Sequence, residues 1–549
     1  MDAMLVLSAA EMQVCDRATT ERFGVASIDL MRAAASAVAV FAQERFPQAQ
    51  RVTVLCGRGN NGGDGMMAAR LLADAGLRVT TILLGEPDGL KGDAAVAWRE
   101  LISPERGTIH VVATNEQLAR LRDALETDLI VDAVLGTGFK PPMKGLALNA
   151  LEWVLGCKAP VLSVDLPSGW PADSTDFTAG APVFPSDAVV TFTAPKPAHV
   201  FGNLTGSWDQ PVVVAPIGSP DAAIVSALKL EWAGSAMSLV QAPRAVDGNK
   251  GKYGHVLVVG GTFGSAAGKA GAPAMTALGA LRIGAGLVTA AVPLPAMGVV
   301  SSIAPELMTW GLETTAAGAV GETLTQDRIE ALMAGKTVLA IGPGLGQLPE
   351  TSRFVTELLA ATKIPAVIDA DALNILARTP EIIPKLARGR SIVLTPHPGE
   401  MARLTGMTIK EIQDNRLDAA RTFAARTGAT LVLKGARTLI AHPDGRILVN
   451  TTGNPGMAKG GSGDLLTGFI AGMMAQFPGD VQRAIESGVF LHGLAADLAV
   501  RAGDEHTLLA TDCLAFLPQA FQICGSYFRN QGKSRYGWIQ GISRDRDLR

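Results

Sequence analysis

Short apolar runs alternate along residues 1–224 with segments whose apolar residues recur every three or four positions. The runs lie at residues 51–56, 128–131 and 161–164, and residues 66–75 have the helical spacing. This alternation is typical of parallel strands that are buried on both faces by helices. We therefore predict an α/β fold in which a Rossmann-like three-layer αβα domain comes first.

The same pattern restarts after a stretch rich in proline and alanine at residues 215–244. Further strand candidates follow at residues 255–259, 337–341, 366–368, 392–394 and 431–433. We place the domain boundary near residue 225, which gives domains at residues 1–224 and 225–525. No internal repeat relates them, so they are different units rather than a duplication. Residues 526–549 are basic and lack periodicity, and we predict a disordered tail, with a weak contact to an anionic surface as the alternative.

The bulk composition narrows the possible partners and the compartment. The 549 residues exceed what one hydrophobic core usually supports, and a net charge of -3 leaves no basic patch for nucleic acid. The five cysteines form no CxxC pair, which favours a reducing compartment over a disulfide framework or a zinc site. Acidic residues near the N-terminus oppose a signal peptide, and Asp29 and Arg32 interrupt the most apolar stretch. We expect a cytoplasmic protein without a membrane or nucleic-acid partner.

A glycine-rich loop at residues 57–65 directly follows the first strand candidate and precedes a helix pattern. Glycines in this place let backbone amides approach a phosphate at the start of a helix, which suits a pyrophosphate. The loop is not the GxGxxG fingerprint of dinucleotide-binding folds, and a plain glycine-rich turn is the alternative. Asp132, Asp165 and Lys196 stand at three other strand ends and supply complementary polar groups.

An aspartate at the end of an apolar strand is costly to bury without a partner, so Asp132 and Asp165 indicate a ligand or a cation. Asn61, Asp132 and Ser168 offer only oxygen ligands. Oxygen ligands favour an alkali or alkaline-earth cation over zinc, which prefers cysteine and histidine.

These motifs resemble those of the epimerase domain in the bifunctional NAD(P)H-hydrate repair enzymes, over about the first 220 residues. Residues 60–65 are NNGGDG, residues 131–138 are VDAVLGTG and residues 164–169 are VDLPSG, in the order of the family. The resemblance implies that the R and S hydrates of NADH and NADPH are interconverted, and that Asn61, Asp132 and Ser168 hold a potassium ion. It implies hydrate binding by Asn60, Asn61, Gly62, Gly63, Asp64, Gly136, Thr137, Gly138, Phe139, Lys140, Pro141, Pro142 and Asp165.

Epimerisation requires a hydroxyl to leave from one face of the ring and to return on the other. A carboxylate that acts as general acid and base suits this task, and Asp165 is the catalytic candidate. Asp64 or an ordered water remains an alternative for the proton carrier.

Several polar loops follow strand candidates in the second domain. Residues 260–270 look like a P-loop, but the required glycine is one position off and Ala270 stands where a serine or threonine would hold magnesium. Other polar clusters lie at residues 342–346, 369–374 and 395–400. In the last cluster, prolines on both sides of His397 fix it in a non-helical turn, which favours a site residue over a structural histidine.

Residues 460–464 have the sequence GGSGD and precede an apolar helix pattern. Consecutive glycines let several amide hydrogens converge on an anion, and the helix dipole adds roughly 0.3 to 1 kcal/mol for an anion there. Lys434 follows another strand and adds a cation for a nucleotide phosphate. Helix capping alone would explain Asp464, but phosphoryl transfer needs a base beside an anion hole, so we predict that Asp464 is catalytic.

Residues 225–525 resemble the ribokinase-like fold and, within it, the dehydratase domain of the same repair enzymes. The motifs GPGLG, DADALN, TPHPGE, KGART and NPGMAKGGSGD stand in the order of the family. The resemblance implies dehydration of the S hydrate at the expense of ADP, giving AMP and phosphate, or of ATP, with Mg²⁺ accompanying the nucleotide. Asp464 would deprotonate the ring hydroxyl as that hydroxyl attacks the terminal phosphate. The resemblance implies substrate contacts from Ala272, Gly344, His397 and Asp464, and nucleotide contacts from Lys434, Gly435, Ala436, Arg437, Thr438 and Gly463.

The sequence leaves some alternatives open. A ribokinase-like small-molecule kinase fused to a nucleotide-binding module would use the same anion hole, although the motifs of the first domain argue against it. Lys459 stands where many relatives carry threonine or serine, a difference that bears on the choice between ADP and ATP. We also expect a homo-oligomer. The predicted activities are thus an isomerase in the first domain and a lyase in the second.

Overall fold

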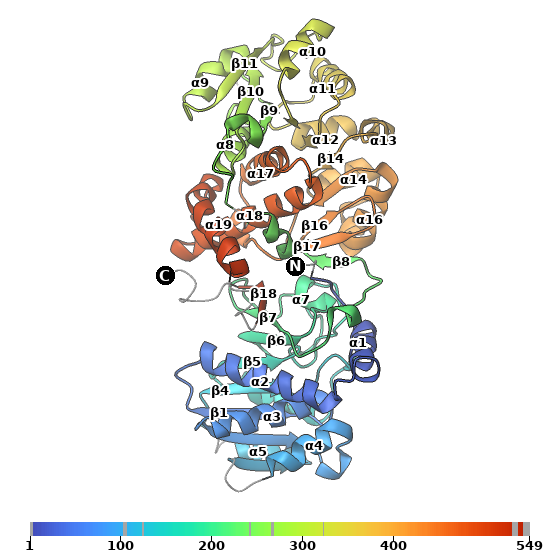
Figure 1. The fold of residues 1–549 in the computed structure, drawn as a ribbon, viewed down its shortest axis with the longest axis vertical. Coiled ribbons are helices and arrows are strands. Elements are labelled where there is room, and N and C mark those ends of the chain that lie inside the picture. Colours follow the sequence, from blue (N-terminus) through green and yellow to red (C-terminus); the bar gives the residue numbers. More distant parts are fainter. Residues whose placement is uncertain are drawn as a thin grey trace. The chain divides into compact units, whose positions relative to one another are not determined.

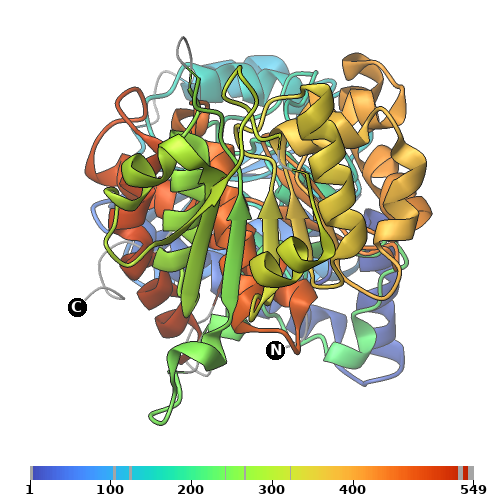
Figure 2. The same cartoon turned by 90° about the horizontal axis from the view of Figure 1, so that it is seen from above.

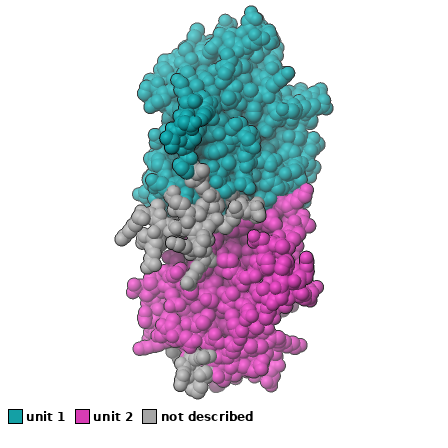
Figure 3. Space-filling model, viewed as in Figure 1, with its two compact units in different colours: residues 1–3, 231–530 teal, residues 4–230, 531–549 magenta. Residues whose placement is uncertain are grey.

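The computed structural model describes residues 4–102, 107–122, 126–240, 243–264, 268–321, 323–529 and 536–541. The chain forms two compact units (Figure 3). The N-terminal unit holds residues 4–230 and 531–549, and the C-terminal unit holds residues 1–3 and 231–530. The predicted boundary near residue 225 lies slightly earlier than this division. Residues 226 and 227 stay with the N-terminal unit because Ser226 Oγ and the Ala227 amide bind the carboxylate of Glu11, at 3.1 Å and 2.7 Å.

The N-terminal unit is built on an eight-stranded sheet (Figure 1). In sheet order the strands are β18 (Gly537–Gln540), β7 (Val212–Ala215), β6 (Ala188–Phe192), β5 (Val161–Val164), β4 (Leu129–Ala133), β1 (Arg51–Cys56), β2 (Arg78–Leu84) and β3 (Thr108–Val112). All strands are parallel except β18, which pairs antiparallel with β7. The chain reverses its direction of travel across the sheet between β1 and β4. In such sheets ligands bind at this switch point, outside the carboxyl ends of the strands.

Helices cover both faces of this sheet, because alternate residues of each strand point to opposite sides. Val52, Val54 and Cys56 of β1 pack in one core with α2 (Ser27–Arg45), α3 (Asn60–Asp74) and α4 (Gly92–Leu101). Leu55 packs in a second core with α5 (Asn115–Arg122) and α6 (Leu146–Leu155). The predicted three-layer αβα arrangement is therefore confirmed. Two further helices, α1 (Ala9–Glu21) and α7 (Pro197–Phe201), lie toward the carboxyl ends of the strands.

The predicted disordered tail is wrong for residues 536–541. They contain strand β18, and the Tyr536 hydroxyl donates to the Ala37 carbonyl at 2.7 Å while its ring meets Phe41 edge-on at 5.3 Å. Tyr536 and Ile539 bury apolar surface that the basic composition of the segment conceals. Residues 526–529 belong to helix α19, and the rest of the predicted tail, residues 530–535 and 542–549, lies outside the described part.

The C-terminal unit is built on a ten-stranded sheet. In sheet order the strands are β11 (Met308–Leu312), β10 (Leu287–Pro293), β9 (His255–Val259), β12 (Val338–Ile341), β13 (Ala366–Ile368), β14 (Ile392–Leu394), β15 (Thr430–Leu433), β16 (Thr438–Ala441), β17 (Ile447–Asn450) and β8 (Leu230–Trp232). Strands β11 to β15 are parallel, and β15, β16 and β17 are joined antiparallel. The switch point of this sheet lies between β9 and β12.

Helices also cover both faces of the second sheet, as Figure 2 shows by the yellow and orange helices on one side of the strands and the red helices on the other. One layer holds α8 (Gly271–Arg282), α17 (Ser462–Gln476), α18 (Val481–Ala502) and α19 (Cys513–Arg529). The other side carries α10 (Gln326–Met333), α11 (Pro349–Ala361), α12 (Ala370–Leu376), α13 (Ile383–Leu386), α14 (Pro398–Thr405), α15 (Ile409–Asp414) and α16 (Arg416–Thr427), and the short α9 (Met297–Ser301) follows β10. The predicted α/β fold is confirmed for this unit too. Among the described residues, no helix is long and apolar enough to cross a membrane.

Candidate active sites

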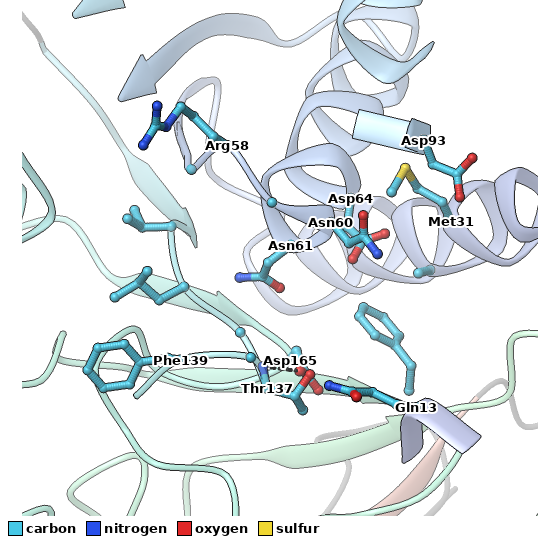
Figure 4. Close-up of a pocket in the computed structure, with 18 of the residues that line it drawn as sticks. Gln13, Met31, Arg58, Asn60, Asn61, Asp64, Asp93, Thr137, Phe139 and Asp165 are labelled. Carbon is cyan, nitrogen blue, oxygen red and sulfur yellow. Dashed lines mark hydrogen bonds between the residues drawn. The ribbon is translucent and has the colours of Figure 1, made fainter. Parts of the chain in front are cut away.

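A cavity of about 1250 Å³ lies at the switch point of the N-terminal unit (Figure 4). The start of α3 contributes Asn60 and Asn61, and the loop after β4 contributes residues 134–139. Asp165 and Lys196 follow β5 and β6. Parallel strands end at one edge of the sheet, so segments separated by more than a hundred residues meet here. The structure thus brings together the strand ends that the sequence singles out.

Not all of the predicted hydrate-binding residues line this cavity. Those that do are Asn60, Asn61, Asp64, Gly136, Thr137, Gly138, Phe139 and Asp165. Gly62 and Gly63 are buried in the first turn of α3, and Lys140, Pro141 and Pro142 are absent from the cavity wall of the described residues. Gly62 has a packing role, because a Cβ atom there would lie 1.9 Å from the Gly57 carbonyl oxygen. This close approach lets α3 begin directly against the loop.

The start of α3 is suited to an anion. Its N-cap residue is Gly59, and no side chain caps the helix. The amide hydrogens of the first turn are therefore available to a phosphate group, and the helix dipole favours negative charge at this end. This geometry supports the pyrophosphate role that the glycine loop suggests.

Asp165 is a buried carboxylate held by three donors. Its Oδ1 accepts from Lys196 Nζ and from the Thr191 hydroxyl, both at 2.8 Å. Its Oδ2 accepts from the Thr137 amide at 3.3 Å (Figure 4). Burial works to raise the pKa of Asp165, but the Lys196 ammonium and the other groups around the carboxylate together outweigh it and hold that pKa below its ordinary value. Asp165 is therefore an ionised carboxylate at neutral pH, which suits a base better than an acid.

The backbone around Asp165 is also fixed. Its φ of 66° lies in the left-handed region, which few residues other than glycine adopt, although aspartate and asparagine do so more readily than most. His199 Nε2 lies 2.7 Å from the Asp165 carbonyl oxygen, and His199 Nδ1 accepts from the Lys196 amide at 2.9 Å. Burial lowers the pKa of His199 to about 4, so its ring is neutral and Nε2 donates to the carbonyl. This histidine holds the turn that presents Asp165.

Asp132 and Ser168 form a second buried cluster beside the cavity. Ser168 donates to both carboxylate oxygens of Asp132, from Oγ at 2.5 Å and from its amide at 2.8 Å. Burial raises the pKa of Asp132 to about 6, and no lysine or arginine pairs with it among the described residues. The side chain of Asn61 lies against Gly136, and its buried Nδ2 has no hydrogen-bond partner among the described groups. Flipping the side-chain amide of Asn61 would place its oxygen where Nδ2 now lies.

Helix α1 contributes residues that the sequence does not reveal as part of a site. Met12, Gln13 and Asp16 line the cavity, although α1 precedes the sheet and carries no recognisable motif. Asp64 on α3 also lines the cavity, where burial and the neighbouring charges of Asp165 and Asp16 raise its pKa well above the ordinary value. Among the carboxylates that line this cavity, the pKa of Asp165 is lowered, whereas the pKa values of Asp16 and Asp64 are raised.

A second cavity, of about 490 Å³, lies at the switch point of the C-terminal unit. It is surrounded by the segment after β9, by the loops after β12, β13 and β14, and by the start of α17. Its lining residues are Gly268, Lys269, Gly271, Ala272, Met275, Gly344, Ala370, Asp371, Asn374, Glu400 and Asp464. The predicted residues Ala272, Gly344 and Asp464 are thus brought together.

Asp464 does not cap helix α17. The N-cap position is occupied by Gly461, which has a φ of 93°, and the helix has no side-chain cap. The Asp464 carbonyl oxygen accepts from the Thr276 hydroxyl at 2.9 Å, which fixes the backbone while the carboxylate faces the cavity. Burial, with the nearby charge of Asp369, raises the pKa of Asp464 to about 6. The alternative of a purely capping aspartate is therefore excluded.

The charge of Lys434 works to lower the pKa of Asp464. Lys434 Nζ donates to Asp369 Oδ1 at 2.8 Å, and Thr467 Oγ1 donates to the other oxygen of Asp369 at 2.8 Å. Burial works to lower the pKa of Lys434, but the charges of Asp369, Glu400 and Asp464 and the hydrogen bond to Asp369 together outweigh it and raise that pKa. A Cβ atom on Gly463 would lie 3.4 Å from Lys434 Nζ, so the glycine leaves the start of α17 open to this cation.

Other predicted residues of this unit lie outside the cavity wall. His397 is half-exposed and caps α14, where its Nδ1 accepts from the Gly399 amide at 3.0 Å. Arg437 donates to the Thr451 carbonyl at 3.1 Å, and the Thr438 hydroxyl donates to the Gly435 carbonyl at 2.9 Å. These contacts give each residue a local structural role, and the nucleotide contacts of residues 434–438 stay a prediction. Lys459 donates to the His506 carbonyl at 2.6 Å and also lies outside the wall.

Sequence reasoning missed four polar residues of this cavity: Lys269, Asp371, Asn374 and Glu400. Lys269 lies in the segment that fails the P-loop pattern, and its Nζ stands 3.7 Å from Asp371 Oδ2. The other three belong to strand-end clusters that the sequence shows. Their position directly after parallel strands could have indicated that they meet at a site, because the carboxyl ends of parallel strands converge at one edge of the sheet.

Comparisons with known proteins agree with this division. One family model, described as NAD(P)H-hydrate dehydratase, matches residues 256–519, and another, described as YjeF-related protein N-terminus, matches residues 27–198. The bifunctional NAD(P)H-hydrate repair enzyme Nnr of Moorella thermoacetica is 41% identical over 532 residues, covering 94% of this chain and 96% of that protein. The protein of the same name from Escherichia coli is 34% identical over 504 residues, covering 91% of each chain. A solved structure, the ADP/ATP-dependent NAD(P)H-hydrate dehydratase from Bacillus subtilis co-crystallised with ATP/Mg²⁺, is 31% identical with a TM-score of 0.44, covering 52% of this chain and 97% of that one.

Proposed function

Since the chain belongs to the family of bifunctional NAD(P)H-hydrate repair enzymes, we propose that it restores hydrated NADH and NADPH in two steps, one in each unit. The N-terminal unit epimerises the R and S hydrates. The C-terminal unit dehydrates the S hydrate at the expense of ADP or ATP. The observation that carries this division is that a carboxylate lines each switch-point cavity and a lysine acts on it: Lys196 is ion-paired with Asp165, and the charge of Lys434 works to lower the pKa of Asp464.

In the epimerase step, the ionised Asp165 accepts a proton from the water that returns to the ring. Its negative charge also stabilises the positive charge that develops on the ring when the hydroxyl leaves. Lys196 keeps Asp165 ionised, and the Thr137 amide orients its second oxygen. The uncapped start of α3 receives the pyrophosphate of the hydrate, and Asn60 and Gly138 line the same space.

We propose that Asn61, Asp132 and Ser168 hold a potassium ion. Asp132 is a fully buried carboxylate without a cationic partner among the described residues, and potassium would compensate its charge. With the Asn61 amide flipped, all three side chains would offer oxygen atoms as ligands, which suits a hard cation. The ion would supply charge compensation that holds the loop after β4 in place for substrate binding.

In the dehydratase step, Asp464 acts as general base toward the ring hydroxyl. Its pKa of about 6 keeps it mostly ionised near neutral pH while it still accepts a proton readily. The amides at the start of α17 and the Lys434 ammonium stabilise the transferring phosphoryl group. Phosphorylation turns the ring oxygen into a good leaving group, and its departure restores the dihydronicotinamide.

Mg²⁺ accompanies the nucleotide in this proposal. Asp371 and Glu400 line the cavity beside Asp464, and carboxylate oxygens are the ligands that Mg²⁺ prefers together with phosphate oxygens. The ion would neutralise the phosphates. We further propose a cytoplasmic location, which the free thiols of all five cysteines suit, and a homo-oligomer, which size-exclusion chromatography with light scattering would test.

One assay tests the proposed function. The full-length protein is mixed with the R and S hydrates of NADH or NADPH and with ADP or ATP, and the regained absorbance of the reduced nicotinamide is followed. We expect complete recovery from both hydrates with at least one nucleotide. No recovery with either nucleotide would refute the dehydratase, and a stable phosphorylated product would instead favour a small-molecule kinase.

A further inference from the structure

The cavity of the N-terminal unit contains a carboxylate that the proposed mechanism does not yet use. Asp16 lies on α1 and lines this cavity. Its Oδ1 atom is buried and has no hydrogen-bond partner among the described groups. A buried polar atom without a partner costs stability, and such atoms in native proteins commonly serve a ligand or a reaction.

The position of Asp16 is fixed by the packing of its helix. Met12, Asp16 and Thr20 line the cavity and are spaced by four residues, so they form one stripe on α1. Next to this stripe, Cys15 packs in a buried cluster with Leu7 and with Ala194. The helix begins with a capping box, in which Ser8 and Glu11 satisfy the first amides. The carboxylate is therefore presented by a rigid element.

We propose that Asp16 is a catalytic residue of the epimerisation, the acid that protonates the leaving hydroxyl while Asp165 serves as the base. This inference rests on the epimerase activity proposed above. Lys196 contacts Asp165 at 2.8 Å, and no ion pair joins any lysine or arginine to Asp16 in the described chain. The two carboxylates thus have different environments, which is how one site separates an acid from a base.

The proton balance of the step is complete. Asp16 gives its proton to the hydroxyl, the C–O bond breaks with its electron pair on oxygen, and water leaves while the ring nitrogen stabilises the cation. A water then adds to the opposite face and gives its proton to Asp165. Asp165 returns this proton through solvent to Asp16, and the site is ready again.

The charges around Asp16 support this assignment. Burial raises the pKa of Asp16 to about 6, with Lys196 lowering it and Asp165 raising it. An acid of this pKa gives and regains a proton near neutral pH. Asp64 on α3 is the rival, but burial and the charges of Asp165 and Asp16 raise its pKa well above the ordinary value, which favours its protonated form and suits a hydrogen-bond donor to the substrate. The other titratable neighbours on α1 are the Cys15 thiol, whose pKa is raised mainly by burial, and Arg17 at the cavity wall.

The test uses the full-length protein without nucleotide, so that dehydration cannot proceed and only epimerisation is observed. Pure R hydrate is added, and the approach to the R and S mixture is followed by chromatography over a range of pH. We expect Asp16→Asn to lower kcat by about 100-fold or more, with KM little changed, and to remove the decline of the wild-type rate at high pH. Asp16→Glu should retain part of the activity, and Asp29→Asn, on the exposed surface of α2, should behave as wild type.

The outcomes distinguish a failure of the proposed epimerase activity from a failure of the proposed role of Asp16. A wild-type rate equal to spontaneous epimerisation would refute the epimerase itself. Two results with an active wild type would overturn the role of Asp16. One is an Asp16→Asn variant as active as the wild type, and the other is a high-pH decline that disappears in Asp64→Asn instead. Thermal unfolding at neutral pH distinguishes a structural role. Because ionising a buried carboxylate of raised pKa opposes folding, Asp16→Asn should melt no lower than wild type, and a clear loss of stability would contradict the proposal.

Discussion

Removing the Lys196 ammonium should destabilise the N-terminal unit through the charge it leaves behind. Lys196 and Asp165 are both buried, and their charged atoms lie 2.8 Å apart. Lys196→Met keeps most of the side-chain volume but leaves the Asp165 carboxylate without its cation. Removing one partner of a buried pair commonly costs about 3 to 5 kcal/mol. For a domain of this size, each kcal/mol lowers the melting temperature by roughly 2 to 4 °C.

The loss should depend on pH in a defined direction. In the wild type the pKa of Asp165 is lowered, so its stabilising contribution is present above its unfolded pKa and is lost as pH falls through the folded pKa. In the variant, burial without a cation raises this pKa, and stability falls as pH rises through the raised value. The difference between the two proteins should therefore be largest near about pH 7 and should shrink toward about pH 4.

Hydrogen-exchange mass spectrometry over β5, β6 and α7, at several pH values, measures this unit separately from the other. Arg32→Met is the matched control, because it removes a surface cation that binds Asp29 and Glu100, and surface pairs contribute little. The double variant Lys196→Met with Asp165→Asn should recover part of the lost stability, since no unpaired charge remains. A loss no larger than that of the control, or one independent of pH, would refute the reasoning.

Four further predictions concern the proposed reactions. Asp464→Asn should abolish recovery of reduced-nicotinamide absorbance from both hydrates, because the base toward the ring hydroxyl is lost; recovery at the wild-type rate would contradict its role. Asp165→Asn should leave the S hydrate repaired and limit the R hydrate to spontaneous epimerisation, measured with each pure hydrate, and loss of S repair would contradict the division between the units. The kcat of wild-type dehydration should fall as pH drops below about 6, where Asp464 becomes protonated, and a flat kcat profile would argue against it. Asn61→Ala should raise the potassium concentration needed for epimerisation and leave S dehydration unchanged, and an unaltered potassium dependence would exclude the proposed ion site.

The strands and the loops that follow them could be predicted because their physical causes are local. Runs such as residues 51–56 are mainly apolar, which marks strands buried on both faces, and glycines mark the turns after them. The glycine-rich segments at residues 57–65 and 460–464 therefore stand out in the sequence, although in the structure α3 already begins at Asn60 and α17 at Ser462. The tail illustrates the limit of this reasoning. Its basic composition indicates disorder, yet Tyr536 and Ile539 find an apolar surface on the N-terminal unit that only the folded chain provides.

The sequence by itself determined the α/β class of both units, the strand ends that carry chemistry, and the candidates Asp165 and Asp464. Tertiary structure decided which of these groups meet and in what charge state. Asp16 enters the first cavity from a helix without a motif, Lys269 enters the second from a segment that fails its pattern, and His397 turns to cap its own helix. The reason is physical: a residue's type and local spacing fix its conformational preference, whereas its partners and its burial arise from segments far apart in the chain. The low pKa of Asp165 and the raised pKa of Asp464 follow from those partners and that burial.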